Sequence, residues 1–146
     1  IFGYGYSFIT YTQYSLTNLV SNTGVVSTDV TGVGSVRAAL AAAGYGGDKA
    51  IFGYGNNNPM GSNVLNMTNK VSNTGVVSTN TTGVGTARSG LAAAGYGGDK
   101  AIFGYGQSSS SYVNITNKVS NTGVVSTDTT GVGAARDSLA AASYSS

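Results

Sequence analysis

The chain has 146 residues, a net charge of +2 and only 8% charged residues, and glycine, serine, threonine and asparagine fill about half of its positions. It contains no cysteine, histidine, tryptophan or glutamate, which excludes thiolate nucleophiles, imidazole bases, a disulfide framework and the usual zinc sites. The small charge argues against a surface for nucleic-acid phosphates, and no apolar run approaches the roughly 18 residues that span a bilayer. We therefore expect no cofactor, no metal site, no nucleic-acid partner and no membrane insertion.

The chain begins with the motif IFGYG, which recurs at Ile51 and Ile102 and opens three repeats. Each copy is followed by a variable stretch, then by VSNTGVVST, then by an arginine and the small-residue segment LAAAGYGGDKA, which reads LAAASYSS in the last copy. The variable stretches are 6–19, 56–70 and 107–118, and the arginines are Arg37, Arg88 and Arg136. The repeats therefore cover approximately 1–50, 51–101 and 102–146.

Two glycine-containing turns divide each repeat into short strands. The sequence GGDK separates LAAAGY from AIFGYG, and SNTG separates TNKV from GVVST. Glycine and aspartate supply the positive φ of tight hairpin turns, so both sequences predict hairpins. Four antiparallel strands in a unit of about 50 residues are typical of a β-propeller blade, so we expect an all-β fold with three four-stranded blades.

A helix is the alternative for the alanine-rich segment of each repeat. The sequence VRAALAAAG has a high helix propensity and ends in a glycine where a C-cap could lie. Such a helix would span only about eight residues, which is short. Small side chains also permit neighbouring sheets to approach closely, and the GGDK turn leads directly into IFGYG, so a strand is favoured.

The stretch ARSGLAAAGYGGDKAIFGYG, residues 87–106, resembles a kelch repeat. In that family an arginine precedes a small-residue strand, and a glycine-containing hairpin leads to a hydrophobic strand that ends in Gly-Gly before a variable loop. The resemblance covers every repeat and implies kelch-like propeller blades. The chain departs from the pattern because Gly-Tyr-Gly replaces the double glycine, the characteristic tryptophan is absent and valine replaces the third-strand aromatic residue. The near-identical repeats are also similar to low-divergence repeat proteins of marine phage and environmental genomes, some of them virion-associated.

The two ends of the sequence are expected to complement each other. The sequence begins at IFGYG and finishes after LAAASYSS, so the break falls within the GGDK hairpin. The C-terminal strand, 139–144, is therefore predicted to complete the blade that starts at residue 1, which removes two exposed sheet edges. Because a propeller needs about four to eight blades, we expect two chains to exchange these strands in a six-bladed homo-oligomer. The alternative is a fragment of a longer single-chain propeller.

The repeated charged residues are expected to be structural. The resemblance to kelch blades implies that Arg37, Arg88 and Arg136 donate ion pairs and backbone hydrogen bonds, with Asp29 and Asp128 as candidate partners. Asn80 at the equivalent position indicates that a hydrogen bond can replace the charge. A ring of arginines that binds an anion is the alternative. Asp48 and Asp99 are interpreted as turn residues, since a calcium site would need more oxygen ligands than one aspartate supplies.

The tyrosines that recur with the repeat are expected to pack between blades with their hydroxyls bonded. They are Tyr4, Tyr54 and Tyr105 in IFGYG, and Tyr45, Tyr96 and Tyr144 after the alanine-rich segments. The alternative is a rim of tyrosine and asparagine that stacks on sugars. Variable loops on a rigid scaffold commonly carry binding, which makes their residues candidate ligand contacts. These candidates are Tyr6, Phe8, Tyr11, Tyr14, Asn56, Asn57, Asn58 and Tyr112.

Together these features favour a non-enzymatic structural or surface-interaction repeat module at the cell exterior or on a virion. Its expected partner is a second copy of the chain, and a glycan or another surface protein is a further candidate partner. The alternative is a lectin-like carbohydrate-binding propeller that uses repeated rim pockets. An enzyme is the least supported class, because no acid and base pair stands out from the repeat and an active site would break its symmetry.

Overall fold

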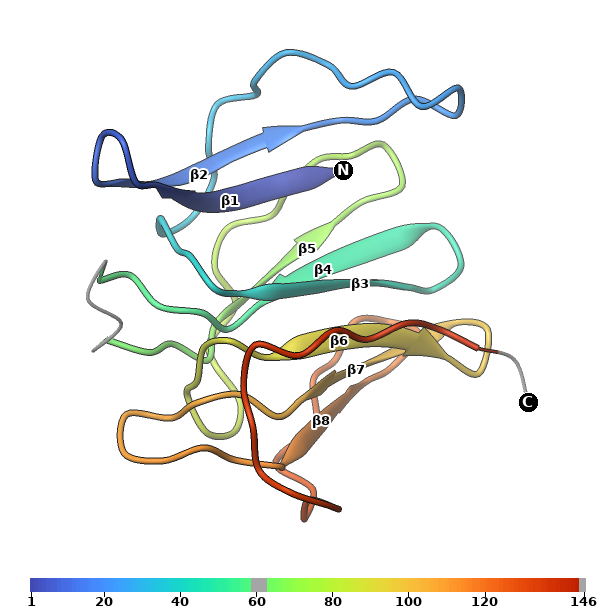
Figure 1. Ribbon diagram of the computed structural model, residues 1–146. Coiled ribbons are helices and arrows are strands. Elements are labelled where there is room, and N and C mark those ends of the chain that lie inside the picture. Colours follow the sequence, from blue (N-terminus) through green and yellow to red (C-terminus); the bar gives the residue numbers. More distant parts are fainter. Residues whose placement is uncertain (59–62, 145–146) are drawn as a thin grey trace.

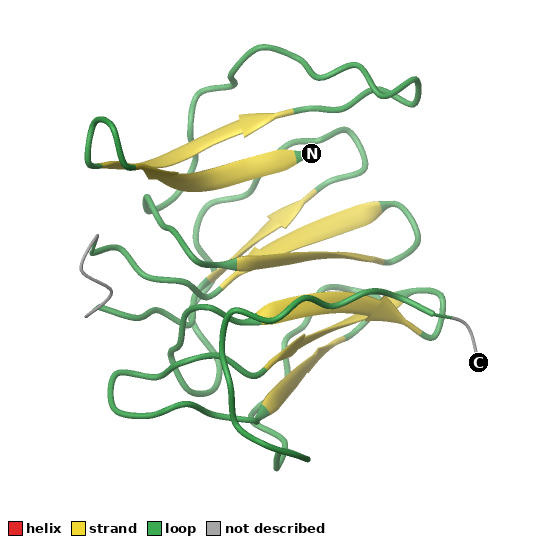
Figure 2. Cartoon of the chain, in the orientation of Figure 1, coloured by secondary structure: helices red, strands yellow, loops and turns green. Residues whose placement is uncertain are grey.

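The fold is known from a computed structural model that describes residues 1–58 and 63–144. The described chain is all-β, with three small antiparallel sheets and no helix, as Figures 1 and 2 show. The first sheet pairs two strands, and the second and third sheets pair three strands each. The prediction of an all-β fold is confirmed, and no α-helix long and apolar enough to cross a membrane exists in these residues.

Each sheet follows the order of its strands in the sequence. The first sheet contains β1 (Phe2–Ser7) and β2 (Thr12–Asn18). The second contains β3 (Ala41–Tyr45), β4 (Lys49–Gly53) and β5 (Thr68–Val71). The third contains β6 (Ala92–Tyr96), β7 (Lys100–Gly104) and β8 (Thr116–Val119). Every neighbouring pair is antiparallel. Short hairpin turns impose this direction on β1–β2, β3–β4 and β6–β7.

The alanine-rich segments form strands in the second and third sheets, so the helix alternative is wrong there. β3 pairs with β4 over its whole length, from Ala41 opposite Gly53 to Tyr45 opposite Lys49. The turn between them places Gly46 and Gly47 at φ values of 62° and 80°, which glycine adopts at little cost. The turn chemistry therefore outweighs the helix propensity of alanine.

The fourth strand expected in each repeat is reduced to isolated pairings. In the second sheet, β5 and the segment 75–81 share two isolated bridges, Val71 opposite Val77 and Thr68 opposite Thr81. The two paired residues of β5 are three positions apart, whereas their partners Val77 and Thr81 are four positions apart. One extra residue on one side of a strand pair is a β-bulge. Ser78 Oγ accepts a hydrogen bond of 2.9 Å from the Lys70 amide in this stretch, so a side chain replaces a backbone acceptor.

The three sheets lie one after another, from the first at the top of Figure 1 to the third at the bottom. β3 packs beside β6, so the alanine-rich strands of the second and third sheets are neighbours. The sheets of residues 1–58 and 63–144 form no closed ring within one chain. The main apolar core lies between the second and third sheets, where Ile51, Tyr54, Phe103 and Val119 are fully buried.

The C-terminal segment 139–144 contains no strand, although its sequence matches β3 and β6 closely. It runs along β6 in Figure 1, and the Gly95 amide donates a hydrogen bond of 3.1 Å to Ser143 Oγ. Within one chain it has no partner equivalent to β4 or β7, and β1 pairs only with β2 among the described residues. The strand predicted at 139–144 is therefore absent from the single chain, because a ladder needs a second strand.

Candidate functional site

The strongest repeated constellation is an arginine that stacks on the tyrosine of each IFGYG motif. The guanidinium carbons of Arg37, Arg88 and Arg136 lie 4.7, 4.1 and 4.3 Å from the ring centroids of Tyr4, Tyr54 and Tyr105. These are cation–π distances. The structural role of the arginines stays a prediction, and these contacts are the observations that favour it.

The tyrosines of this constellation have the same unusual backbone in all three repeats. Tyr4, Tyr54 and Tyr105 have φ values of 64°, 64° and 62°, a left-handed conformation that costs a non-glycine residue about 1–2 kcal/mol. Each hydroxyl donates a hydrogen bond to a valine carbonyl in the loop before the arginine, at 3.1, 3.2 and 2.9 Å. Two contacts thus fix each tyrosine in this strained conformation: the hydrogen bond of its hydroxyl and the arginine stacked on its ring.

Two of the arginines also join neighbouring sheets. Arg37 Nη2 donates to Asn69 Oδ1, and Arg88 Nη2 donates to Asn117 Oδ1 at 2.7 Å. Arg88 Nε donates to the Tyr105 carbonyl at 2.8 Å as well. Both arginines and both asparagines are completely buried. Each arginine therefore stacks on the tyrosine of one sheet and bonds to an asparagine of the next.

The predicted ion pairs between these arginines and aspartates are not formed. In the described residues the ion pairs are Lys49–Asp48 and Lys100–Asp99, and an asparagine stands between Arg88 and Asp128. The sequence contained a signal for these asparagines, because Asn18, Asn69 and Asn117 recur in the motif TN(K/L)V. Their side chains were overlooked because the motif was interpreted only as a strand.

A second pair of contacts crosses the same sheet boundaries next to each asparagine. Between the first and second sheets, Asn80 Nδ2 donates to Ser35 Oγ at 2.9 Å. Between the second and third sheets, Thr86 Oγ1 donates to Asp128 Oδ2 at 2.7 Å, and the Thr86 amide also donates to this carboxylate. Asn80 and Asp128 therefore form hydrogen bonds across equivalent boundaries, but with a serine and a threonine and not with the arginines that the sequence analysis expected as their partners.

Burial dominates the electrostatics of the arginine–tyrosine stacks. It lowers the pKa of Arg37 and Arg88, and the neighbouring tyrosine partly opposes this effect. It raises the pKa of Tyr4 and Tyr54, against the attraction of the arginine. Burial also tends to raise the pKa of Asp128, but hydrogen bonds from Thr86 and Asn117 outweigh it and lower the pKa.

The third arginine completes only half of this constellation. Arg136 stacks on Tyr105 and donates to the Ala134 carbonyl at 3.0 Å, as Arg88 donates to Thr86. Unlike the other two arginines, however, it is exposed. At the opposite end of the chain, Asn18 donates to Asp29 Oδ1 at 2.8 Å, as Asn117 donates to Asp128, but it receives no hydrogen bond from an arginine of the described chain.

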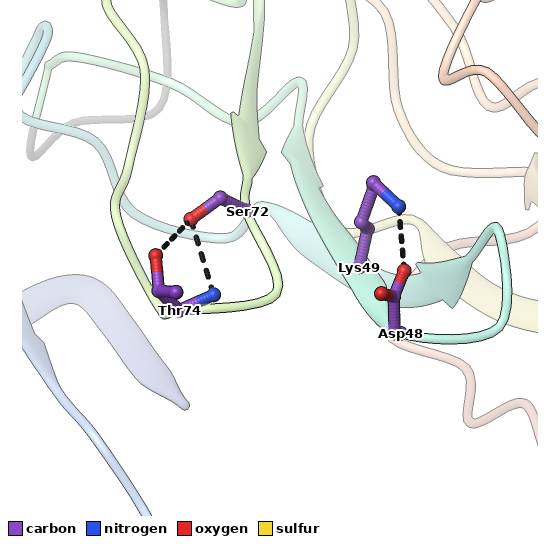
Figure 3. A network of polar contacts seen from close by, with 4 residues as sticks. All are labelled: Asp48, Lys49, Ser72 and Thr74. Atoms are coloured by element: carbon purple, nitrogen blue, oxygen red, sulfur yellow. Dashed lines mark hydrogen bonds and ion pairs between the residues drawn. The ribbon is translucent and has the colours of Figure 1, made fainter.

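The GGDK and SNTG turns lie together at one end of the molecule. Figure 3 shows Lys49 pairing with Asp48, beside a turn in which Ser72 Oγ accepts a hydrogen bond from the Thr74 amide. The hydrogen bond from Lys49 lowers the pKa of Asp48, and one from Asn73 in the adjacent turn adds to this. No group of three or more acidic side chains that could hold a metal ion occurs in residues 1–58 and 63–144.

A hollow of about 600 Å³ opens at this same end of the molecule. Its aromatic lining consists of Tyr45, Tyr96 and Tyr144, the equivalent residues that follow the alanine-rich segments. Lys49 and Lys100 line it as well. Tyr45 is only 4% exposed, whereas Tyr96 is 37% and Tyr144 85% exposed, so three equivalent side chains have three different environments.

The candidate ligand residues of the variable stretches lie in or beside three separate loops at the opposite end. In the first loop Phe8 and Tyr11 are exposed. The ring of Phe8 contacts the ring of Tyr6 edge to face, with the two centroids 4.8 Å apart. Tyr14, on β2, lies with its hydroxyl 3.3 Å from Thr10 Oγ1. These contacts involve aromatic residues in or beside the first loop. Tyr112 is exposed and belongs to the third loop.

The second loop carries the asparagine candidates, and its residues 59–62 lie outside the described chain. Asn56 is buried and receives hydrogen bonds from Gln13 Nε2 on its carbonyl and its Oδ1, at 3.2 and 3.0 Å. Asn57 Oδ1 accepts one from Asn63 at 2.6 Å, and Asn58 follows in the same loop. The side chain of Asn56 therefore bonds to Gln13 of the first sheet, and its role in ligand binding stays a prediction.

No protein-family model matches this chain, and no curated protein is similar enough to indicate a relationship. The dominant feature of the structure is the arginine–tyrosine–asparagine contact that joins one sheet to the next.

Proposed function

We propose that the chain is a non-enzymatic structural repeat module that assembles with itself into a closed, kelch-like β-propeller. The observation that carries this proposal is the repetition of one set of contacts at both sheet boundaries. Arg37 and Arg88, each buried and bonded to an asparagine of the next sheet, hold successive sheets in the same relation. A constant relation between successive units leads either to a closed ring or to an open fibre.

Closure of the ring is supported by the free edges of the chain. β1 has one unpaired edge among the described residues, and the segment 139–144 has no strand partner. Unpaired edges tend to associate, and pairing them with each other removes both. Two chains of three sheets give six blades, within the usual range of four to eight. The setting on a virion or at the cell exterior stays a prediction from the resemblance stated above.

The mass of the 146-residue chain in solution tests this proposal. Size-exclusion chromatography with light scattering is expected to give twice the chain mass of 14.5 kDa, with no larger species as the concentration rises. A mass of one chain at micromolar concentrations would contradict self-assembly. A mass that grows with concentration would indicate an open chain of units and contradict closure.

Carbohydrate binding is the second candidate function, and the tyrosine-lined hollow is the observation that favours it. Sugars stack on exposed aromatic rings, and the glycines of the turns leave backbone groups accessible beside Tyr96. A glycan array would test it with the wild-type chain, a Tyr96→Ala variant and a Tyr11→Ala variant. Loss of binding in Tyr96→Ala alone would place the site in the hollow, and loss in Tyr11→Ala alone would place it in the variable loops. The absence of binding to any glycan would remove this candidate.

A further inference from the structure

We infer that the outer face of the third sheet binds the outer face of the first sheet in a second copy, through the same contacts that join sheets within one chain. This inference rests on the proposed self-assembly and names the residues that would form its joint. At three of four contacts, the third sheet presents one half and the first sheet presents the other half, and at the remaining contact the halves are the backbones of Ser138 and Ala39. Each half lacks, in the described chain, the intersheet contact that its equivalents make. Four independent contacts agree on this arrangement.

The first contact is a phenylalanine packed on a glycine of the preceding sheet. Phe52 lies over Gly3, and Phe103 lies over Gly53, where an added Cβ would come within 2.9 and 2.7 Å of the ring. Each ring also meets a tyrosine of the preceding sheet edge to face, with centroids 5.2 Å apart. These two phenylalanines are 4% and 0% exposed, whereas the equivalent Phe2 is 62% exposed.

The complementary place for Phe2 is open on the third sheet. Gly104 is equivalent to Gly3 and Gly53, yet no aromatic ring covers it, and the nearest atom to an added Cβ is Thr116 Cγ2 at 3.4 Å. Tyr105 beside it lacks the edge-to-face phenylalanine that Tyr4 and Tyr54 have. Phe2 of a second copy would cover Gly104 and meet Tyr105 in the same geometry.

The second contact is the hydrogen bond from arginine to asparagine. Arg136 is stacked on Tyr105 and already oriented by its bond to the Ala134 carbonyl, but it is exposed. Asn18 on the first sheet donates to Asp29, as Asn117 donates to Asp128. In the joint, Arg136 would donate to Asn18 of the second copy. Alanine replaces the hydroxyl residue at position 134, so Asp29 would receive only the backbone amide there.

The third contact is between backbones. Within the chain, the Gly90 amide donates to the Ala39 carbonyl at 2.8 Å, and the Ser138 amide donates to the Gly90 carbonyl at 2.7 Å. These three residues hold equivalent positions and share positive φ values of 51°, 63° and 52°. These hydrogen bonds form a series that runs from Ala39 through Gly90 to Ser138. The Ser138 carbonyl would accept the next hydrogen bond of the series, from the Ala39 amide of the second copy. Residues 140–142 would then pair with β1 of that copy, as 41–43 pair with β4.

The fourth contact is a tyrosine packed on the glycine of an SNTG turn. The ring of Tyr45 lies over Gly123 in the next sheet, where an added Cβ would come within 2.8 Å. Tyr96, the equivalent residue of the third sheet, is partly exposed, and Gly24 of the first sheet has no neighbour within 4 Å of an added Cβ. Tyr96 would cover Gly24 of the second copy.

A glycine substitution at this fourth contact tests the joint with a closely matched control. Gly24→Ala adds a methyl group that touches nothing in one chain, at a φ of 80°. Gly47→Ala does the same at a φ of 80° in the GGDK turn, where no neighbour is expected in the assembly. Because both variants have the same backbone strain, their difference reports contact with Tyr96. We expect Gly24→Ala to raise the dissociation constant of the assembly about tenfold or more, and Gly47→Ala to change it less than about threefold. Equal effects would overturn the joint.

A cysteine pair tests the predicted strand register directly. The chain has no cysteine of its own, so every disulfide in a variant is unambiguous. Residues directly opposite each other in an antiparallel pair are close enough for a disulfide. The pair Ala142→Cys with Ile1→Cys is equivalent to Ala94→Cys with Ile102→Cys, whose residues are opposite each other on β6 and β7. The second pair is the control that forms its disulfide within one chain.

The outcomes separate this joint from the proposed function. A covalent two-chain species from the Ala142 and Ile1 pair supports both the joint and the closed ring. A ladder of longer covalent species supports the joint and overturns the closed ring. If light scattering gives two chains but this pair forms no interchain disulfide, while the control pair oxidises, the joint is overturned and self-assembly survives through another face.

Discussion

The segments 40–45, 91–96 and 139–144 have nearly the same sequence and do not have the same structure. LAAAGY forms β3 and β6, whereas LAAASY, which differs only by Ser143 in place of glycine, forms no strand. The two strands each lie beside a KAIFG strand, and the C-terminal segment has none in its chain. The difference shows that these small, weakly patterned residues acquire strand structure from a partner and not from their own preference.

The same comparison holds for side chains. Arg88 and Arg136 both stack on a tyrosine, but only Arg88 is buried and bonded across a sheet boundary. If the partner determines the structure, substitutions should matter at the completed boundaries and have little effect at the open faces of a separated chain.

The largest effect is expected for the buried arginine. Arg88→Met removes a cation–π contact and leaves the Tyr105 carbonyl, the Thr86 carbonyl and Asn117 Oδ1 without their donor. We expect a loss of about 2–4 kcal/mol in the free energy of unfolding, measured by urea denaturation. Arg136→Met, measured in dilute solution where chains are separate, is the control and should cost less than about 1 kcal/mol. Similar losses for both variants would contradict the contrast between closed and open boundaries.

A methyl group at the aromatic contact gives the next largest effect. Gly53→Ala places a Cβ 2.7 Å from Phe103 Cζ, and this ring is fully buried. We expect the overpacking to cost about 1–3 kcal/mol. Gly104→Ala, whose Cβ meets only Thr116 at an ordinary 3.4 Å, should change the stability of the separate chain by less than about 0.5 kcal/mol. Thermal or urea denaturation of both variants distinguishes them, and a neutral Gly53→Ala would show that the sheets are not packed this closely.

The smallest effect concerns pH, because the two completed boundaries differ by one titratable group. The pKa of Asp128 is lower in the folded chain than in the unfolded chain. Its carboxylate therefore stabilises the fold at pH values above the unfolded pKa of about 4. This contribution is lost as the pH falls from there through the lower pKa of the folded chain. Because the group is exposed, the contribution should be below about 1 kcal/mol.

Two reciprocal substitutions isolate this effect. Asp128→Asn should reduce the loss of stability between pH 7 and pH 3, and Asn80→Asp should add such a loss at the first boundary. Denaturation curves of both variants across this range would show it. An unchanged pH dependence in both would mean that these side chains do not couple the sheets.

The amino-acid sequence was sufficient to predict the repeats, the all-β class and the GGDK hairpins, because glycine at Gly46 and Gly47 is required by turn geometry. It did not reveal the bulge at Ser78, since a serine side chain that replaces a backbone acceptor leaves no periodic pattern. Asn69 was missed for a related reason: its role depends on an arginine 32 residues away in the chain. Among the loop candidates, the burial of Asn56 depends on Gln13 of another sheet.

Amide hydrogen exchange of the segment 140–143 tests the central claim most directly. At concentrations where the chain assembles, the account predicts that Ala140–Ala142 are protected to a degree similar to Ala41–Ala43 in β3, and that this protection disappears on dilution to separate chains. Exchange at 140–143 that stays as fast as in an unstructured peptide, in a sample that light scattering shows to be assembled, would contradict the claim that a second copy completes this strand.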